Sequence, residues 1–161
     1  MELFKVCGVL AVPFPSRSQS MIAATSRRSG PTGPLHALLL AFPVALFPAA
    51  LVADIAYLNT AVIQWTNFAQ WLNAGADFFT GLVLAWTLLA SAVGRKSASV
   101  VYTGALAALL VLGVINAFQH GKDGWASVGT LGLVLSVLCT LLALAAGFVA
   151  YSGLGTQEAR A

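Results

Sequence analysis

Four long apolar stretches, separated by short polar joints, dominate the chain after residue 34. Charged residues make up only 8% of the chain, against roughly 25% in an ordinary globular domain. A helix needs about 20 mostly apolar residues to cross the hydrocarbon layer of a bilayer, and each stretch is long enough. The sequence therefore predicts an all-α fold, an integral membrane bundle of four antiparallel transmembrane helices. The predicted spans are residues 35–58, 71–93, 98–119 and 127–151.

The first predicted span contains two prolines, Pro43 and Pro48. Proline removes a backbone donor and kinks a helix, but neighbouring helices can satisfy the freed carbonyl groups inside a membrane. We therefore expect one bent span here, rather than two re-entrant halves.

The segment 59–70, between the first two spans, is too polar to cross the membrane and carries no charge. At helical spacing its apolar side chains share one face and its polar side chains share the opposite face. The apolar set continues to Leu72, two residues beyond the segment. The two sets are Val62, Trp65, Ala69 and Leu72, and Thr60, Gln64 and Asn67. This pattern is typical of a short helix lying in the outer membrane interface.

The basic residues indicate how the bundle is oriented. Four spans place both termini on one side, and short segments rich in Lys and Arg stay in the cytoplasm. That side would hold Lys5, Arg17, Arg27, Arg28, Arg95, Lys96 and Arg160, and the other side only Lys122. We expect cytoplasmic termini, anionic lipid headgroups as partners of the basic face, and no binding of nucleic acid.

Three regions follow from this arrangement. Residues 1–33 are rich in Ser, Arg, Pro and Gly and are predicted to be a flexible cytoplasmic tail. Residues 34–153 form the four-span membrane domain, and residues 154–161 form a second cytoplasmic tail. Either Met1 or Met21 is compatible with the start of the chain, and the membrane domain does not depend on this choice.

Small residues recur once per helical turn in every span, which in lipid favours close packing between helices. The first span has the row Ala37, Ala41, Ala45, Ala49 and Ala53, and the last has Gly132, Ser136, Thr140, Ala143 and Gly147. Shorter rows are Gly81 with Ala85 and Gly104 with Ala108. These rows predict a tight bundle and no wide aqueous pore.

Several polar residues fall near the outer ends of the spans, where they could converge. The candidate outer polar cluster is Asp54, Asp77, Asn116, His120 and Asp123. Carboxylates around one imidazole could bind a divalent metal ion or relay protons. The alternative is structural: an Asp at a helix start suits the helix dipole, and the other carboxylates are simply solvated.

His36, at the inner start of the first span, is a candidate inner ligand. Four-helix membrane bundles suggest haem held by two imidazoles. However, His36 and His120 belong to opposite faces, separated by a hydrocarbon layer of about 30 Å, so one haem cannot take both. No cofactor is predicted, although haem b with another second ligand remains open, as does a metal.

The order of several short motifs resembles a bacterial four-span membrane family, domain of unknown function 2231. In the first span these are Leu35-His36, Phe42-Pro43 and Asp54, followed by the segment from Thr60 to Trp65, Ala69-Gln70-Trp71 and Ala74-Gly75. The remaining motifs are the segment from Asn116 to Trp125 and that from Gly132 to Ser136. The chain departs from the family pattern at Ala37, where Pro is expected, and in lacking a further His in the third span. The resemblance implies the fold, a bacterial inner membrane location and an accessory role beside respiratory or redox proteins.

The joints are too short for a soluble catalytic domain, and phosphate-binding, HExxH and serine-elbow motifs are absent from the sequence. We therefore expect a non-enzymatic membrane scaffold or accessory subunit. Its partners would be the lipid bilayer, a second copy of the chain, or a respiratory or redox membrane protein. The alternatives are an electron-transfer protein that binds haem b or quinone, and a small proton or metal-ion transporter.

Overall fold

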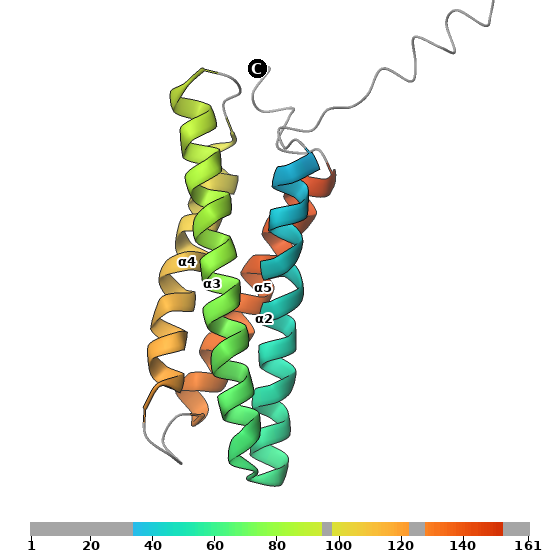
Figure 1. The fold of residues 1–161 in the computed structure, drawn as a ribbon, viewed down its shortest axis with the longest axis vertical. Coiled ribbons are helices and arrows are strands. Elements are labelled where there is room, and N and C mark those ends of the chain that lie inside the picture. The colour runs from blue at the N-terminus through green and yellow to red at the C-terminus, as the bar shows by residue number, and fades with distance from the viewer. Residues whose placement is uncertain (1–33, 95–97, 123–127, 153–161) are drawn as a thin grey trace, which may run out of the picture.

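The computed structural model describes residues 34–94, 98–122 and 128–152. Within these ranges the chain forms four helices: α2 (Pro34–Thr60), α3 (Ile63–Ala92), α4 (Val100–His120) and α5 (Thr130–Ser152). Each is long and apolar enough to cross a membrane, and the helices run alternately up and down (Figure 1). The predicted all-α four-span bundle is confirmed. The predicted tails and Asp123 lie outside the described residues.

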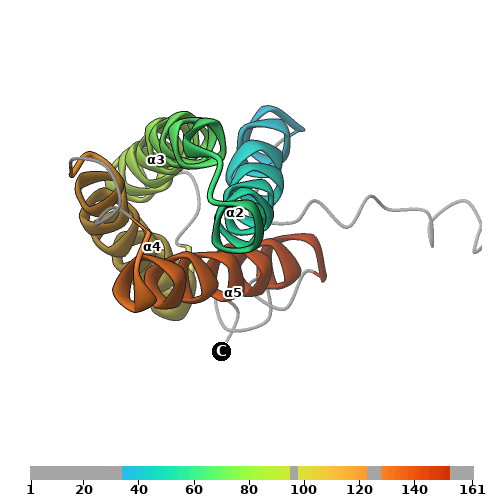
Figure 2. The ribbon, with the colours of Figure 1, turned by 90° about the horizontal axis from the view of Figure 1, so that it is seen from below.

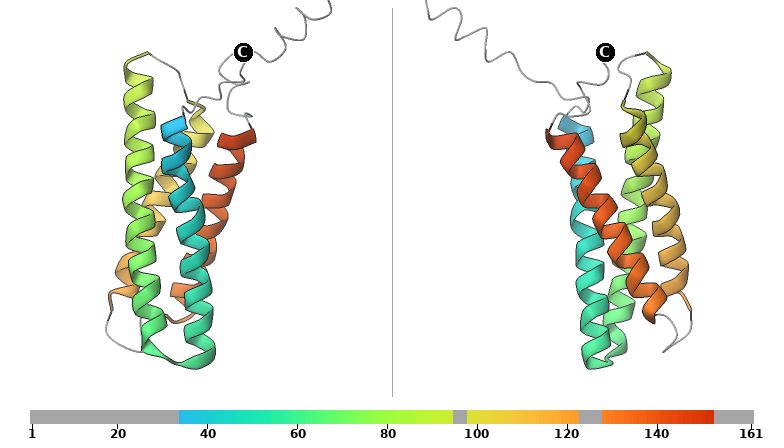
Figure 3. Two further views of the ribbon diagram at one scale, coloured as in Figure 1. Left: turned by 45° about the vertical axis from the view of Figure 1, so that its right-hand side comes forward. Right: turned by 180° about the vertical axis from the view of Figure 1, so that it is seen from behind.

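The helices form a ring in which each packs against its two neighbours, α2 against α3 and α5, and α4 against α3 and α5 (Figure 2). Helix α5 runs obliquely across the bundle (Figure 3). We call the end with the connection 61–62 and His120 the distal end. The opposite end, which holds Pro34 and Ser152, is the proximal end.

Helix α2 continues through both of its prolines as a single element of 27 residues. Pro43 faces the interior of the bundle and Pro48 is half-buried. Each removes one backbone donor, but the flanking turns keep their hydrogen bonds and the packed neighbours hold them in place. The prediction of one span, rather than two re-entrant halves, is confirmed.

The prediction of a separate interfacial helix in the segment 59–70 is wrong, because residues 59–60 end α2 and residues 63–70 form the first turns of α3. The chain reverses at Ala61, which adopts a left-handed φ of 53°, and Val62, so that α3 begins at Ile63. No Gly or Pro occurs between residues 63 and 74, so nothing interrupts the hydrogen-bond ladder once it has begun. The amphipathic pattern of this segment describes the end of a long helix that extends beyond the apolar span.

The predicted small-residue rows divide into two groups. The row on α5 is buried from Gly132 to Gly147 and is confirmed. In the row on α2, three alanines are exposed, and the interior positions of that helix belong to larger side chains such as Leu40 and Phe47. The exposed alanines are Ala41, Ala45 and Ala49. The expectation that this row packs the bundle is therefore wrong for these three alanines, whereas Ala53 at the end of the row is buried.

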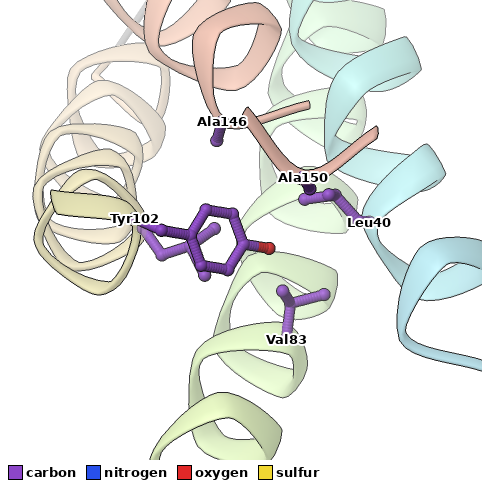
Figure 4. Close-up of a cluster of buried hydrophobic side chains, with 6 residues drawn as sticks. Leu40, Val83, Tyr102, Ala146 and Ala150 are labelled. Carbon is purple, nitrogen blue, oxygen red and sulfur yellow. The ribbon is translucent and has the colours of Figure 1, made fainter. Parts of the chain in front are cut away.

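The interior of the proximal half is an apolar cluster contributed by all four helices: Leu40, Val83, Tyr102, Leu106, Ala146 and Ala150. The side chain of Tyr102 extends from α4 into the centre of this cluster (Figure 4). A second cluster follows toward the middle of the bundle: Phe47, Ala76, Leu109, Cys139 and Ala143. The polar side chains of the distal half lie beyond this second cluster.

Candidate functional site

Asp54 lies inside the distal half of the bundle and not at its surface. It is six residues before the end of α2, and its side chain is fully buried. The sequence placed it at the end of a span, near the outer surface, because helix α2 was expected to end sooner. A carboxylate removed from water in this way needs a positive or hydrogen-bonding partner.

The partner of Asp54 is His120, in the last turn of α4. The Nε2 atom of His120 lies 2.8 Å from Oδ1 of Asp54, and both side chains are buried. The other ring nitrogen, Nδ1, donates to the backbone carbonyl of Asn116 at 2.9 Å. Because a carbonyl can only accept, Nδ1 carries a hydrogen. One further proton then joins Nε2 to the carboxyl group of Asp54.

Two more side chains close this arrangement into a ring. Ser136 on α5 donates to Oδ2 of Asp54 at 2.5 Å, and Asn116 on α4 donates from Nδ2 to Ser136 Oγ at 3.0 Å. We call Asp54, Asn116, His120 and Ser136 the polar clamp. It joins α2, α4 and α5, and it engages both oxygens of Asp54 and both nitrogens of His120.

Asp77 lies deeper than the polar clamp. It is the fifteenth residue of the 30-residue helix α3 and is 8% exposed. Its carboxyl group occupies the space beside Gly113 on α4, where a Cβ atom would stand 1.9 Å from Oδ1 of Asp77. Phe47 of α2 borders the same space, with its Cζ atom 3.1 Å from that Cβ position. Neither carboxyl oxygen of Asp77 has a hydrogen-bond partner among the described residues.

Other buried polar atoms near this depth also have no partner in the described part of the chain. They are both side-chain polar atoms of Asn73, Oδ1 of Asn116 and Oγ1 of Thr140. Asn73 is one helical turn distal to Asp77 on the same face of α3, and Thr140 is one turn proximal to Ser136 on α5. We call Asn73, Asp77, Asn116 and Thr140 the unsatisfied polar layer.

The predicted outer cluster is therefore brought together only in part. Asp54, Asn116 and His120 meet in the polar clamp, whereas Asp77 lies against Gly113, about 4.5 Å along the helix axis from Asn116 by helical rise. The structure gives no contact between Asp77 and the Asp54–His120 pair, and Asp123 is not described. In the described ranges, no three of the His, Cys, Asp and Glu side chains form a group suited to a metal ion.

His36, the candidate inner ligand, lies in the first turn of α2 and is 3% exposed. Its Nε2 atom is 3.0 Å from the hydroxyl oxygen of Thr87. That hydroxyl donates to the carbonyl of Val83 at 2.7 Å, so it accepts from His36. The ring of His36 lies 6.0 Å from that of Tyr102. His36 therefore has a hydrogen-bond partner inside the bundle.

The structure separates the two histidines along the bundle axis. His36 and Asp54, the partner of His120, are 18 residues apart on α2, which corresponds to about 27 Å by helical rise. A single haem cannot span this distance. The sequence argument against a haem held by both histidines agrees with this geometry.

Three residues of the distal core were not recognised from the sequence as polar partners. Ser136 was noted only as a small packing residue, and Asn73 and Thr140 were given no polar role. A signal was present, since Asn73 and Asp77, and likewise Ser136 and Thr140, are four residues apart and share a helix face. Which face of each helix points inward, however, was not evident from composition.

A family model matches residues 32–154, which include all four helices. The model describes a predicted membrane protein family, DUF2231. This chain belongs to that family. No curated protein and no solved structure matches the chain. Membership confirms the resemblance seen in the motifs and establishes a multi-pass membrane protein, and the description carries no activity.

Proposed function

We propose that this chain is a non-enzymatic membrane scaffold or accessory subunit that packs against another membrane protein through helix α2. The observation that carries this proposal is the exposed row of Ala41, Ala45 and Ala49. In lipid, rows of small residues allow two helix backbones to approach closely, and this gain does not depend on the hydrophobic effect. Because the row takes no part in packing the bundle, it is free to receive a helix from outside.

The arrangement of the core favours this role over transport. A proton or metal ion crossing the bundle would pass from the distal polar residues into the proximal cluster around Leu40, Val83 and Leu106, all fully buried. The only polar side-chain atom of this cluster is the hydroxyl oxygen of Tyr102, and placing an ion in such largely aliphatic surroundings is very costly. The buried carboxyl groups suit a binding site that opens to one side of the membrane better than a pathway across it.

The electron-transfer alternative has less support. Both ring nitrogens of His120 are engaged, by Asp54 and by the carbonyl of Asn116, so haem ligation would require breaking the polar clamp. His36 retains an unpartnered Nδ1 atom among the described residues, but it would need a second axial ligand from elsewhere. The bacterial inner membrane and cytoplasmic termini remain part of the proposal, supported by the placement of the basic residues.

The proposal is tested by photo-crosslinking in native membranes. A photoreactive side chain placed at Ala45 should give one discrete protein adduct, which mass spectrometry then identifies as another membrane protein or a second copy of this chain. The matched control carries the same group at Leu144, an exposed position on α5, and should react with lipid.

A second substitution tests whether the adduct depends on the exposed alanine row. An Ala49→Leu substitution in the crosslinking chain should abolish the adduct at position 45, because it fills the surface that the partner helix approaches. If position 45 reacts only with lipid, or if Ala49→Leu leaves the adduct unchanged, the accessory role through α2 is wrong.

A further inference from the structure

Asp77 is the one acidic side chain of the described residues that is buried without a partner. Its two oxygens, like those of Asn73, Asn116 and Thr140, are inaccessible and make no hydrogen bond to the part of the chain that the structure describes. Leaving even one such group unsatisfied costs about 1–3 kcal/mol, and an isolated charge in an apolar interior costs far more. A folded bundle tolerates this set only if something else satisfies it.

The groups around Asp77 do not supply the missing positive charge. On α2 the neighbour is Phe47, and on α4 it is the backbone at Gly113. On α5, Cys139 packs in the same cluster as Phe47, but a thiol adds no positive charge. The other buried carboxyl and imidazole groups in the described distal half, Asp54 and His120, are already paired with each other.

The donor atoms of the unsatisfied polar layer are mainly oxygens. Four side chains contribute five such oxygens, and one of these side chains is a carboxylate. Oxygen ligands suit hard cations, whereas Zn²⁺ and similar metals prefer His and Cys. One carboxylate balances one positive charge, and a divalent ion would leave an excess charge inside the bundle.

We propose that the unsatisfied polar layer, with Asp77 as its charged member, is a binding site for one monovalent cation, either Na⁺ or a proton. Gly113 shapes the site, because any side chain there would displace the carboxyl group of Asp77. Asn73 extends the site one turn toward the distal end, from which the cation enters. On the proximal side the site is followed by the largely aliphatic cluster of Leu40, Val83 and Leu106, and the cation binds without passing across the membrane. It does not depend on the accessory role of α2.

The first experiment measures the reaction of Asp77 with a hydrophobic carbodiimide, which modifies protonated carboxyl groups in membranes. The purified full chain in detergent is labelled at several pH values, in NaCl or in choline chloride at equal ionic strength, and the modified residue is located by mass spectrometry. If Na⁺ occupies the site, labelling of Asp77 falls several-fold in NaCl at constant pH. If a proton occupies it, labelling falls as the pH rises and is equal in the two salts.

The second experiment measures the melting temperature of the full chain in the same salts. A cation that binds only the folded state raises the melting temperature. With Na⁺ in the site, NaCl raises the melting temperature above its value in choline chloride, and Asp77→Asn removes the difference. The control Thr87→Val, which changes a buried hydroxyl in the proximal half, keeps the difference. With a proton in the site, lowering the pH raises the melting temperature of the wild type more than it raises that of Asp77→Asn.

Two results would overturn the proposal. One is carbodiimide labelling at Asp77 that is absent, or that responds to neither pH nor Na⁺. The other is a melting temperature whose dependence on salt and pH is the same in the wild type and in Asp77→Asn. Because neither experiment involves a partner protein, failure here leaves the crosslinking test of α2 unaffected.

Discussion

In the proximal half of the bundle the interior is filled by aliphatic side chains such as Leu40 and Leu106. In the distal half, helices α2, α3 and α4 instead place the polar side chains of Asp54, Asn73 and Asn116 inside the bundle. Among the described residues, the proximal half has a buried contact at its end, between His36 and Thr87, and two buried polar atoms without a partner, Nδ1 of His36 and the hydroxyl oxygen of Tyr102. The distal half instead has a closed ring of hydrogen bonds around Asp54, together with a larger set of polar atoms that lack partners. The two halves therefore differ in what their interior can tolerate.

This difference affects how strictly each half of the bundle fixes the arrangement of the helices. Lipid chains are as apolar as Leu, so the proximal cluster gains little by excluding them and depends on close packing. The polar clamp cannot exchange its contacts with lipid, because a carboxyl group or imidazole exposed to hydrocarbon has no partner there. The distal half should thus fix how the helices are arranged, and it should be the more sensitive half to single substitutions.

The largest effect is expected from His120→Leu. This change leaves the carboxyl group of Asp54 buried without its partner, and breaking a buried pair from one side costs about 3–5 kcal/mol. The free energy of unfolding, measured in mixed micelles with increasing SDS, should fall by that amount. The matched change in the proximal half, His36→Leu, removes one hydrogen bond and should cost only about 1 kcal/mol. Equal losses would show that the two halves do not differ in this way.

Ser136→Ala should have the next largest effect. Ser136 donates to Asp54 and accepts from Asn116, and a hydrogen bond to a charged group contributes about 1.5–3 kcal/mol. Thr87→Val is the counterpart in the proximal half, where polar contacts between membrane helices average about 0.6 kcal/mol. The same unfolding measurement compares them, and a smaller loss for Ser136→Ala than for Thr87→Val would contradict the polar clamp.

Gly113→Ala tests the contact between α3 and α4. The new methyl group would meet Asp77 Oδ1 at 1.9 Å and Asp77 Cγ at 2.9 Å, and overpacking of this kind costs about 1–3 kcal/mol. Gly104→Ala, on the same helix, is the control, because nothing described lies within 4 Å of its added methyl group. The melting temperature should fall for Gly113→Ala and stay level or rise for Gly104→Ala. A neutral Gly113→Ala would mean that Asp77 does not occupy this space.

The smallest effect on stability is expected from Ala45→Leu. Ala45 is exposed on α2, so the larger side chain meets lipid, and the free energy of unfolding should change by no more than about 0.5 kcal/mol. The same substitution should abolish crosslinking to a partner. A large loss of stability in the isolated chain would restore the sequence-based expectation that this row packs the bundle.

The sequence was sufficient to predict the number and approximate limits of the helices, because apolar length alone decides whether a segment can cross a membrane. It also identified Asp54, Asn116 and His120 as a group, since their positions near two helix ends implied a common depth. The depth of Asp77 was not predicted. It depends on α3 beginning at Ile63 instead of Trp71, and on Gly113 leaving space on a different helix.

The inward face of each helix was harder to predict than its limits. In soluble helices a charged face marks the outside, but here Ala45 and Phe47 are both apolar, and only packing determines that Phe47 is buried. Small residues were taken as the packing signal, which was right for Gly147 on α5 and wrong for Ala45 on α2. A bulky side chain can occupy the interior where the opposing helix supplies the small residue, as α5 does.

The unequal lengths of the helices link the polar clamp to the surrounding lipid. Helix α4 has 21 residues, about 31 Å of rise, close to the hydrocarbon thickness of about 30 Å, whereas α2 and α3 extend further at the distal end (Figure 1). His120 thus ends its helix where acyl chains give way to headgroups. Lipids with longer acyl chains would immerse this end of α4 more deeply, and shorter ones would bring water within a turn of Asp54. Acyl-chain length, a property of the host membrane, should therefore tune how firmly the distal end is closed.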